Sequence, residues 1–279
     1  MVYRTQAEDT TIEAERIFFN LIGNLSIETR IMQYHRASIQ SQQIWWDLFK
    51  QDNNITNKQL KREYINLRLG KEYCSVNKLV DIDFMIASEI DLAVTLGEIF
   101  DNLNILYYLG GGLASSFWGE RRQTADADIV VILEPEKVQE LIAALSIEFY
   151  ISETAIDDVM RSRTNSFNVI HTASVIKADI YPINQSNDFD LSAMSRRKQV
   201  QPFSTNNSIY IASAEDIILQ KLRWYKLTKN QSEKQWRDIL GVLKARRNEL
   251  NYNYLKHWSN QLNVSPELEK AIDQATLPE

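Results

Sequence analysis

Two aspartates one residue apart, Asp126 and Asp128, are the residues of this sequence best placed to do chemistry together. They stand at the start of an apolar run, residues 126–132, that is typical of a β-strand. Because alternate residues of a strand point to the same face, both carboxylates aim at the same point. Such carboxylates repel each other unless a cation lies between them, and Mg²⁺ prefers hard oxygen ligands of this kind. The pair therefore predicts a magnesium site.

Three glycines, residues 110–112, lie between a preceding apolar run and the aspartate pair. Glycine lets backbone N–H groups approach a phosphate closely. A phosphate cradle followed by metal-binding carboxylates is the layout of a phosphoryl or nucleotidyl transfer site. Each feature alone has a plain structural explanation, since glycines can form a simple turn and Asp-Ala-Asp can be a solvated strand end. Their occurrence together favours the functional interpretation.

The combined string resembles the polymerase-beta-like nucleotidyltransferases. Members of that superfamily carry a Gly-Gly or Gly-Ser signature after a strand and Asp-x-Asp on the next strand, and this chain has Gly111-Gly112 followed by Asp126-Ala-Asp128. The connector between them looks like the Arg-x-Thr-x-Asp-x-Asp string of small bacterial members, which include abortive-infection and toxin-type proteins. The resemblance implies a site with two Mg²⁺ ions that binds a nucleoside triphosphate.

The same resemblance implies which residues bind the nucleotide. Gly111, Gly112 and Ser115 are expected to touch the β- and γ-phosphates. Arg122 and Thr124, in the connector, are expected to belong to the same nucleotide-binding set.

A third carboxylate, Asp179, lies in another segment typical of a strand, residues 174–183. Alternation would place Val175, Lys177, Asp179 and Tyr181 on one face of that strand. By the resemblance, Asp179 joins the two earlier aspartates as a metal ligand. It is also the candidate general base, which takes the proton from the attacking hydroxyl. The alternative is a surface aspartate on an edge strand.

Two residues near the C-terminus extend the candidate site. The segments around Lys221 and Asp238 resemble the C-terminal part of abortive-infection-type nucleotidyltransferases. The resemblance implies that Lys221 contacts the triphosphate and that Asp238 holds Lys221 or a substrate group in place. Alternatively, Lys221 is a surface lysine and Asp238 caps a helix or forms a salt bridge. The basic run 196–198 either reaches phosphates or a polynucleotide, or is a plain surface run.

Composition sets broad limits on the function. The chain has 279 residues, of which 44% are hydrophobic and 24% charged, which is ordinary for a globular protein. No apolar run is long enough to span a bilayer, and the early sequence is acidic where a signal peptide would be apolar. The net charge of −6 counts against tight non-specific binding of nucleic acid. A lone cysteine, Cys74, excludes an internal disulfide and indicates a reducing compartment, so a cytoplasmic protein without a membrane partner is expected.

Three regions are expected along the chain. Residues 1–83 form a helical region, 84–208 an α/β nucleotidyltransferase core, and 209–279 a second helical region. The expected fold class is α+β, with a small mixed β-sheet flanked by the two helical regions. The expected strands are 105–109, 126–132, 147–151, 165–170, 175–180 and 209–211, and residues 184–201 are expected to be a polar connecting stretch.

The N-terminal region shows apolar residues at helical spacing, beginning with Ile12, Ile17, Phe18 and Leu21. It looks like the short helical proteins found beside small nucleotidyltransferases in some bacteria. That resemblance implies a regulatory or antitoxin-like role for this region.

The leading functional hypothesis is a Mg²⁺-dependent nucleotidyltransferase that moves a nucleoside monophosphate from a triphosphate to an acceptor hydroxyl and releases pyrophosphate. The acceptor is an RNA end, a protein or a small molecule, and a toxin–antitoxin or defence setting is the expected context. The alternative is a catalytically degenerate protein of the same fold that binds a nucleotide or a partner. A kinase-like phosphotransferase is disfavoured because no Walker A lysine follows the glycines and the protein-kinase signature is missing.

Overall fold

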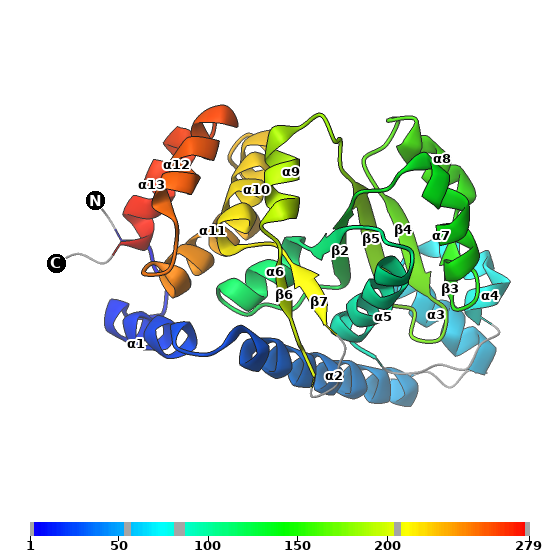
Figure 1. The fold of residues 1–279 in the computed structure, drawn as a ribbon. Helices are drawn as coiled ribbons and strands as arrows, with labels where there is room; N and C mark the ends of the chain where they lie inside the picture. Colours follow the sequence, from blue (N-terminus) through cyan, green and yellow to red (C-terminus); the bar gives the residue numbers. More distant parts are fainter. Residues whose placement is uncertain (1–2, 53–56, 81–86, 204–207, 277–279) are drawn as a thin grey trace.

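One mixed β-sheet of seven strands runs through the centre of the molecule (Figure 1). The computed structural model describes residues 3–52, 57–80, 87–203 and 208–276. Within these ranges the strands are ordered β3-β4-β5-β2-β1-β7-β6 across the sheet. Their bounds are β1 Tyr107–Leu109, β2 Asp126–Val131, β3 Phe149–Ile151, β4 Phe167–His171, β5 Lys177–Pro182, β6 Lys198–Val200 and β7 Ile209–Ile211. The α+β class, with a mixed sheet between helical regions, is confirmed.

Helices surround this sheet. The N-terminal ones are α1 Ile12–Gly23, α2 Ile27–Asp52, α3 Asn57–Arg68 and α4 Asn77–Val80, with a 3₁₀ turn η1 Lys71–Ser75. The middle ones are α5 Glu89–Asn102, α6 Gly111–Trp118, η2 Pro135–Lys137, α7 Val138–Leu145, α8 Glu153–Met160 and α9 Asp188–Ser195. The C-terminal ones are α10 Ala214–Leu227, α11 Glu233–Arg246, α12 Tyr252–Gln261 and α13 Ser265–Ala275. In Figure 1, α2 runs along one long side of the molecule, and α1 and α13 lie at the same end.

The two strands at the middle of the sheet, β2 and β5, are parallel neighbours and have two different faces. On one face Ala127, Ile129, Ala178 and Ile180 are fully or almost fully buried in the main apolar core, which α5 joins by packing across the central strands. The residues between them in the sequence are only partly buried. Alternation therefore assigns the apolar residues to the core and leaves the polar residues on the opposite face.

The strand that carries Asp179 is shorter than expected. It begins at Lys177 instead of residue 174, because Val175 has a positive φ of 58° and lies in the tight turn that joins β4 to β5. A β-branched residue rarely adopts this conformation, so the apolar pattern alone suggested a continuing strand. Val175 is buried in a second, smaller core and does not share the face of Asp179.

The stretch 184–201 is not simply a polar connection. It contains helix α9 and strand β6, and the helix is capped by Asn187, whose side chain accepts hydrogen bonds from two backbone N–H groups. Phe189 and Met194 anchor the helix in the core. The strand expected at 147–151 is also shorter and begins at Phe149, with Ile147 79% exposed.

Helix α1 begins at a capping residue. The Thr11 side chain accepts a hydrogen bond from the N–H of Ala14 and starts α1. The prediction of which face of α1 is buried is wrong, because the helix buries Phe19. The apolar side chains expected on that face are 42–64% exposed, namely Ile12, Ile17, Phe18 and Leu21.

The sheet crosses a boundary that the sequence division placed at residues 208 and 209. Strand β7 pairs with β1 and β6, so the start of the third region completes the same sheet. The other boundary, between residues 83 and 84, lies outside the described residues. No helix in the described ranges is long and apolar enough to cross a membrane.

Candidate functional site

The register between β2 and β5 brings the three predicted carboxylates to one face of the sheet. Asp128 lies directly beside Asp179, and Asp126 lies directly beside Lys177. All four side chains alternate with the buried core residues of their strands, so they share the other face. The site face therefore carries three aspartates and one lysine within two neighbouring strands.

The glycine turn between β1 and α6 is fitted around Asp128. Gly111 has a φ of 54°, and a Cβ placed on it would overlap the Asp128 carboxylate. The N–H of Gly112 donates to Asp128 Oδ2 at 3.2 Å, and the N–H of Gly110 donates to the Asp128 carbonyl at 2.8 Å. Only glycine allows both the left-handed backbone and this close approach. The turn thus holds Asp128 at the N-terminus of α6.

Lys177 forms an internal counter-ion for the other two aspartates. Its Nζ lies 2.9 Å from Asp179 Oδ1, donates to Asp179 Oδ2 at 3.0 Å, and lies 3.6 Å from Asp126 Oδ2. Burial alone would lower the pKa of Lys177. The hydrogen bond to Asp179 and the charge of Asp179 outweigh this effect and raise that pKa. An ammonium thus stands between two of the three carboxylates.

Burial is the main influence on the pKa values of Asp128 and Asp179, which lie side by side. It raises the pKa of Asp128, and the charges of Asp126 and Asp179 raise it further, although the Gly112 N–H and the Lys221 charge oppose this. Burial also raises the pKa of Asp179, against the opposing hydrogen bond from Lys177. Carboxylates in this situation gain most from a nearby cation, because the cation stabilises their charged form.

The donor set fits a divalent metal ion, although no ready-made metal centre is formed. In the ranges that the structure describes, no group of three or more His, Cys, Asp or Glu side chains is gathered closely enough to hold a metal. Lys177 accounts for this arrangement by occupying the space between Asp126 and Asp179. Asp179 Oδ1 is buried, and Lys177 Nζ lies 2.9 Å from it, so a metal ion at this oxygen would compete with the ammonium. Asp126, Asp128 and Asp179 are the residues that would hold Mg²⁺, which prefers carboxylate oxygens.

Thr124, at the start of this strand, contacts the first aspartate. Its hydroxyl donates to Asp126 Oδ1 at 3.0 Å, and its N–H donates to the Tyr34 hydroxyl at 3.1 Å. The predicted nucleotide-binding threonine is therefore a positioning contact for Asp126 in this structure.

A second cluster joins three of the residues predicted to bind nucleotide. Arg122 donates to both carboxylate oxygens of Asp238, at 2.7 and 2.8 Å, and Lys221 Nζ lies 2.8 Å from Asp238 Oδ2. The Lys221 and Asp238 side chains are 7% and 4% exposed, so Lys221 is not a surface lysine. Asp238 is salt-bridged, as the structural alternative stated, and it also holds Lys221, as the functional hypothesis stated.

The charges of this cluster depend on one another. Burial lowers the pKa of Lys221, and the Arg122 charge lowers it further, while Asp238 opposes both. Burial alone would raise the pKa of Asp238. The hydrogen bond from Arg122 and the charge of Lys221 outweigh this effect and lower that pKa. Two cations therefore share one carboxylate, which leaves the cluster with an excess of positive charge.

The two clusters meet at the N-terminus of α6. A Cβ on Gly112 would lie 3.0 Å from Arg122 Nη2 and 3.2 Å from Thr124 Oγ1, so the connector packs against the glycine turn. The charges of Lys221 and Asp128 also interact. Carboxylates on one side and cations on the other side of a helix N-terminus form a setting for a metal-bound polyphosphate.

Ser115, which was predicted to touch the phosphates, is buried and does not face the place where the two clusters meet. It is 1% exposed, and its hydroxyl donates to the Gly112 carbonyl within α6 at 2.9 Å. Ser116 makes the same contact and a second one to the Arg122 carbonyl at 3.1 Å. These serines stabilise the turn and the connector.

The basic run 196–198 contacts other residues of the protein, although Lys198 is exposed. Arg196 pairs with Glu215 at 2.9 Å and stacks over the Tyr254 ring, with its Cζ 3.9 Å from the ring centroid. The neighbouring Arg197 and Lys198 lie over aromatic rings as well. Each of the three cations thus has a contact within the protein.

Sequence reasoning missed the importance of Lys177 and Arg30. The signal for Lys177 was present, because it stands two residues before Asp179 and shares its face. Arg30 on α2 is buried and donates to carbonyls at the C-terminal end of α6, including those of Ser116 and Trp118 at 3.3 and 3.1 Å. No local pattern could have indicated this contact, because the partners are more than 80 residues apart.

Comparisons with known proteins give structural likenesses. No protein-family model matches the chain, and no curated protein matches its sequence. Among solved structures, it is similar to an antigenic nucleotidyltransferase-like protein from Paracoccidioides brasiliensis, with 20% identity, a TM-score of 0.45, and coverage of 67% of this chain and 92% of that chain.

Two further similar structures are antibiotic-modifying enzymes. ANT(2")-Ia in complex with adenylyl-2"-tobramycin has 14% identity and a TM-score of 0.43, with coverage of 62% of this chain and 95% of that chain. The lincosamide antibiotic adenylyltransferase LnuA, with lincomycin bound, has 19% identity and a TM-score of 0.36, with coverage of 57% of this chain and 98% of that chain. Of these three structures, one is described as nucleotidyltransferase-like and one as an adenylyltransferase.

Proposed function

We propose that this protein is a Mg²⁺-dependent nucleotidyltransferase, which moves a nucleoside monophosphate from a nucleoside triphosphate to an acceptor hydroxyl and releases pyrophosphate. The observation that carries the proposal is the β2–β5 register. It sets Asp128 beside Asp179, with Asp126 on the same face, next to a glycine turn, the buried Lys221 and the partly buried Arg122. This arrangement combines metal ligands with a place for a polyphosphate.

Each cluster has a role in this proposal. Asp179 accepts the proton of the attacking hydroxyl, while Asp126 and Asp128 supply oxygen ligands. Bound magnesium, as two ions, would favour ionisation of that hydroxyl and neutralise the charge of the triphosphate and the leaving pyrophosphate. Lys221 and Arg122 offer positive charge to the phosphates. Asp238 keeps both cations in position through its short contacts with them.

The acceptor and the biological setting belong to the same proposal. An RNA end, a protein hydroxyl and a small molecule are the acceptor classes to test, and a toxin–antitoxin or defence setting follows from the sequence resemblance alone. The N-terminal helical region is proposed to regulate the core in an antitoxin-like manner. Its direct support is that Arg30 fastens α2 to α6, the helix that begins at the glycine turn. The single cysteine, Cys74, supports action in a reducing compartment such as the cytoplasm.

The test is incubation of the full chain with Mg²⁺ and each α-labelled nucleoside triphosphate, with pools of RNA, protein and small-molecule acceptors. Pyrophosphate release and a labelled acceptor are expected, and both should be lost in Asp126→Ala and Asp179→Asn. Wild-type turnover in an Asp126→Ala, Asp128→Ala double variant would refute the assignment of these carboxylates.

A second candidate function is nucleotide binding without turnover. Lys177 favours it, because an ammonium between Asp126 and Asp179 can keep the carboxylates together without any metal. Equilibrium dialysis with labelled triphosphate separates the two functions. Tight Mg²⁺-dependent binding without labelled product on any acceptor would favour the degenerate protein.

A further inference from the structure

The face of the sheet that carries the three aspartates continues beyond them onto β4. Asn168 of β4 lies directly beside Asp179 of β5. Its sequence neighbours, Phe167 and Val169, belong to the main apolar core on the opposite face, so alternation assigns Asn168 to the site face. The Asn168 side chain is partly exposed. An amide therefore stands next to the carboxylate that is proposed to act as general base.

The N-terminal region covers the same face a little farther out. Ile170 of β4 shares the face of Asn168, and Tyr150 of β3 lies directly beside Ile170. Both residues pack in the second apolar core, whose other members come mainly from the N-terminal region. Tyr73 of η1 is one of them, with its ring 6.1 Å from that of Tyr150 in an edge-on contact. This packing brings Tyr73 to the border of the site face.

The Tyr73 hydroxyl reaches the residue next to the general base. Asn168 Nδ2 donates to this hydroxyl at 3.1 Å. Within the described ranges, nothing accepts the hydroxyl proton of Tyr73 and nothing donates to Asn168 Oδ1. Asn168 Oδ1 is also not one of the buried unpaired atoms, so it is open to solvent. One donor and one acceptor of hydrogen bonds are thus available beside Asp179.

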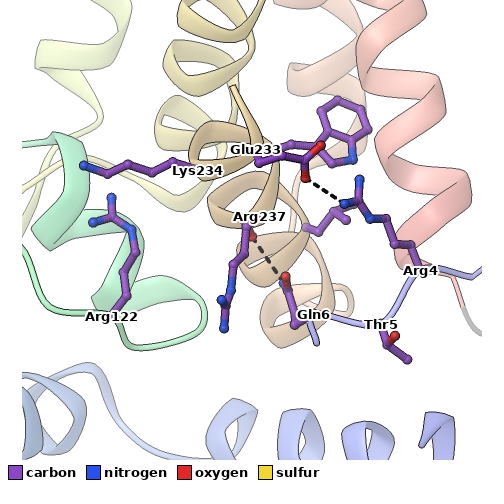
Figure 2. A pocket seen from close by; sticks show the side chains of 9 residues that line it. Arg4, Thr5, Gln6, Arg122, Glu233, Lys234 and Arg237 are labelled. Carbon is purple, nitrogen blue, oxygen red and sulfur yellow. Dashed lines mark hydrogen bonds and ion pairs between the residues drawn. The ribbon is translucent and has the colours of Figure 1, made fainter. Parts of the chain in front are cut away.

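The cations of the site lie on the other side of the aspartates. In the strand order β4-β5-β2-β1, β4 flanks the aspartates on one side, and β1 with its glycine turn flanks them on the other. The charges of Lys221 and Arg122 interact with that of Asp128, which the glycine turn holds. Figure 2 shows Arg122 extending to the same side as Lys234 of α11, and both line one cavity there. The phosphates of a bound triphosphate therefore belong on the β1 side.

This separation fixes the direction from which an acceptor enters. In nucleotidyl transfer the attacking and leaving oxygens are roughly in line with the phosphorus between them. With pyrophosphate leaving toward the cations, the attacking hydroxyl enters from the β4 side. Asp179, Asn168 and Tyr73 are the residues that it meets there.

The β4 side is suited to an uncharged molecule. Among the described site-face residues of β4 and β5, Lys177 is the one cation, and Asp126 and Asp179 already hold it. Asn168 and Tyr73 offer hydrogen bonds and an aromatic ring without charge. A polyanion such as RNA finds no available cation on these strands, whereas a neutral ring with hydroxyl groups matches the donor, the acceptor and the ring.

We propose that Tyr73 and Asn168 bind the acceptor and select a neutral, ring-containing molecule with hydroxyl groups. Their hydrogen bonds direct one hydroxyl to Asp179. The acceptor oxygen then bonds to the α-phosphorus, the bond to pyrophosphate breaks, and the proton passes to Asp179. The N-terminal region thereby completes the transfer site. This inference rests on the proposed nucleotidyl transfer.

The first test uses the full chain with Mg²⁺, each α-labelled nucleoside triphosphate and a choice of acceptors. These are myo-inositol, maltose and uridine as neutral molecules, and an oligoribonucleotide with a free 3′-hydroxyl as the polyanion. Label is expected on a neutral acceptor. Tyr73→Ala and Asn168→Ala should each raise the KM for that acceptor roughly tenfold, because a hydrogen bond is lost, and leave the KM for the triphosphate unchanged.

Two further variants separate the binding role from a structural one. Tyr73→Phe keeps the ring contact with Tyr150 and loses only the hydroxyl, so it should raise the acceptor KM less than Tyr73→Ala does. Tyr252→Ala, at an exposed tyrosine of α12, should change neither KM. An equal rise of both KM values in the Tyr73 variants would overturn the assignment to the acceptor.

The second test measures acceptor binding without turnover. Saturation-transfer NMR in EDTA should detect a neutral acceptor on the wild-type chain and on Asp126→Ala, but not on Tyr73→Ala. If this pattern appears and no acceptor is ever labelled, the transfer function fails and the binding site stands. If transfer occurs with unchanged acceptor KM in Tyr73→Ala and Asn168→Ala, or only the oligoribonucleotide is labelled, the inference is overturned and the transfer function stands. Absence of any bound or labelled neutral molecule also overturns it.

Discussion

At the scale of single residues, one ammonium, that of Lys177, holds two of the three aspartates. Lys177 is within 4 Å of both Asp126 and Asp179, and it reduces the repulsion between carboxylates that lie on adjacent strands. A divalent ion would satisfy the same oxygens with twice the charge. Lys177 and a metal are therefore alternatives at part of the site, and the protein needs one of them.

Replacing Lys177 with methionine should strengthen metal binding. Without the ammonium, Mn²⁺ as a spectroscopic probe is expected to bind roughly tenfold more tightly or better, since a nearby charge of this kind shifts carboxylate equilibria by a factor of ten or more. In EDTA the same variant should melt at a lower temperature, because its carboxylates repel one another. Electron paramagnetic resonance and thermal melting measure both effects, with Lys256→Met as the control. Unchanged Mn²⁺ affinity would contradict the competition.

Gly111→Ala should disrupt the site more than Gly112→Ala does. Alanine at position 111 must adopt a φ near 54° and must also displace the Asp128 carboxylate. The backbone alone costs about 1–3 kcal/mol. A Cβ at position 112 would lie 3.0 Å from Arg122 Nη2 and 3.2 Å from Thr124 Oγ1, so it requires a much smaller displacement than the overlap with Asp128 at position 111. Urea unfolding and pyrophosphate release are the measurements, and equal losses in the two variants would contradict the role given to Gly111.

At the scale of elements, α6 is fixed at both ends. The glycine turn and Asp128 hold its N-terminus, and the buried Arg30 of α2 binds the carbonyls of its last turn. Helix C-termini carry partial negative charge and unpaired carbonyls, so a guanidinium there satisfies both needs. Burial lowers the pKa of Arg30 to about 9. The helix that begins the candidate phosphate site is thus positioned from the N-terminal region.

Arg30→Gln is expected to destabilise the protein by about 3–5 kcal/mol, because several buried carbonyls lose a charged donor. The free energy of unfolding in urea measures the loss, and hydrogen exchange should show faster opening of α6. Arg36→Gln, an exposed arginine on the same helix, should change stability by less than about 0.5 kcal/mol. Indistinguishable stabilities of the two variants would argue against the capping role.

The elements also show what a sequence can predict. The Asp-x-Asp strand was predicted because alternation along a strand is a local pattern. Helix α9 was missed because its cap, Asn187, and its polar residues are also typical of turns. The face of Asp179 followed from alternation, but the start of its strand did not, since Val175 adopts a rare conformation. The Arg30 contact could not be predicted, because it depends on how distant helices pack.

At the scale of the whole molecule, buried charges tie the three sequence regions together. Lys244 of α11 pairs with Glu15 of α1, and both side chains are nearly fully buried. The N–H of Arg4 donates to the Gln274 carbonyl near the other end of the chain. Asp238 connects α11 and α10 with the connector before β2. The N-terminal and C-terminal helices are therefore fastened to the sheet by charge pairs as well as by apolar packing.

The Asp238 cluster should make the free energy of unfolding depend on pH in the acidic range. The folded-state pKa of Asp238 lies below its unfolded value, so its contribution is fully present above the unfolded pKa and is lost as pH falls through the folded pKa. Removing the carboxylate with Asp238→Asn leaves the buried Lys221 and the partly buried Arg122 without their shared counter-ion and should cost about 3–5 kcal/mol at pH 7. The gap between wild type and variant should then narrow below about pH 4, the ordinary aspartate range.

Urea unfolding of both proteins at several pH values between 7 and 3 measures this gap. Asp157→Asn, at an exposed position of α8, is the control, and its gap should stay within about 0.5 kcal/mol throughout. A gap for Asp238→Asn that stays constant down to pH 3 would mean that the carboxylate acts through its shape and hydrogen bonds. In that case the charge of Asp238 would not be what joins α10, α11 and the connector into one unit.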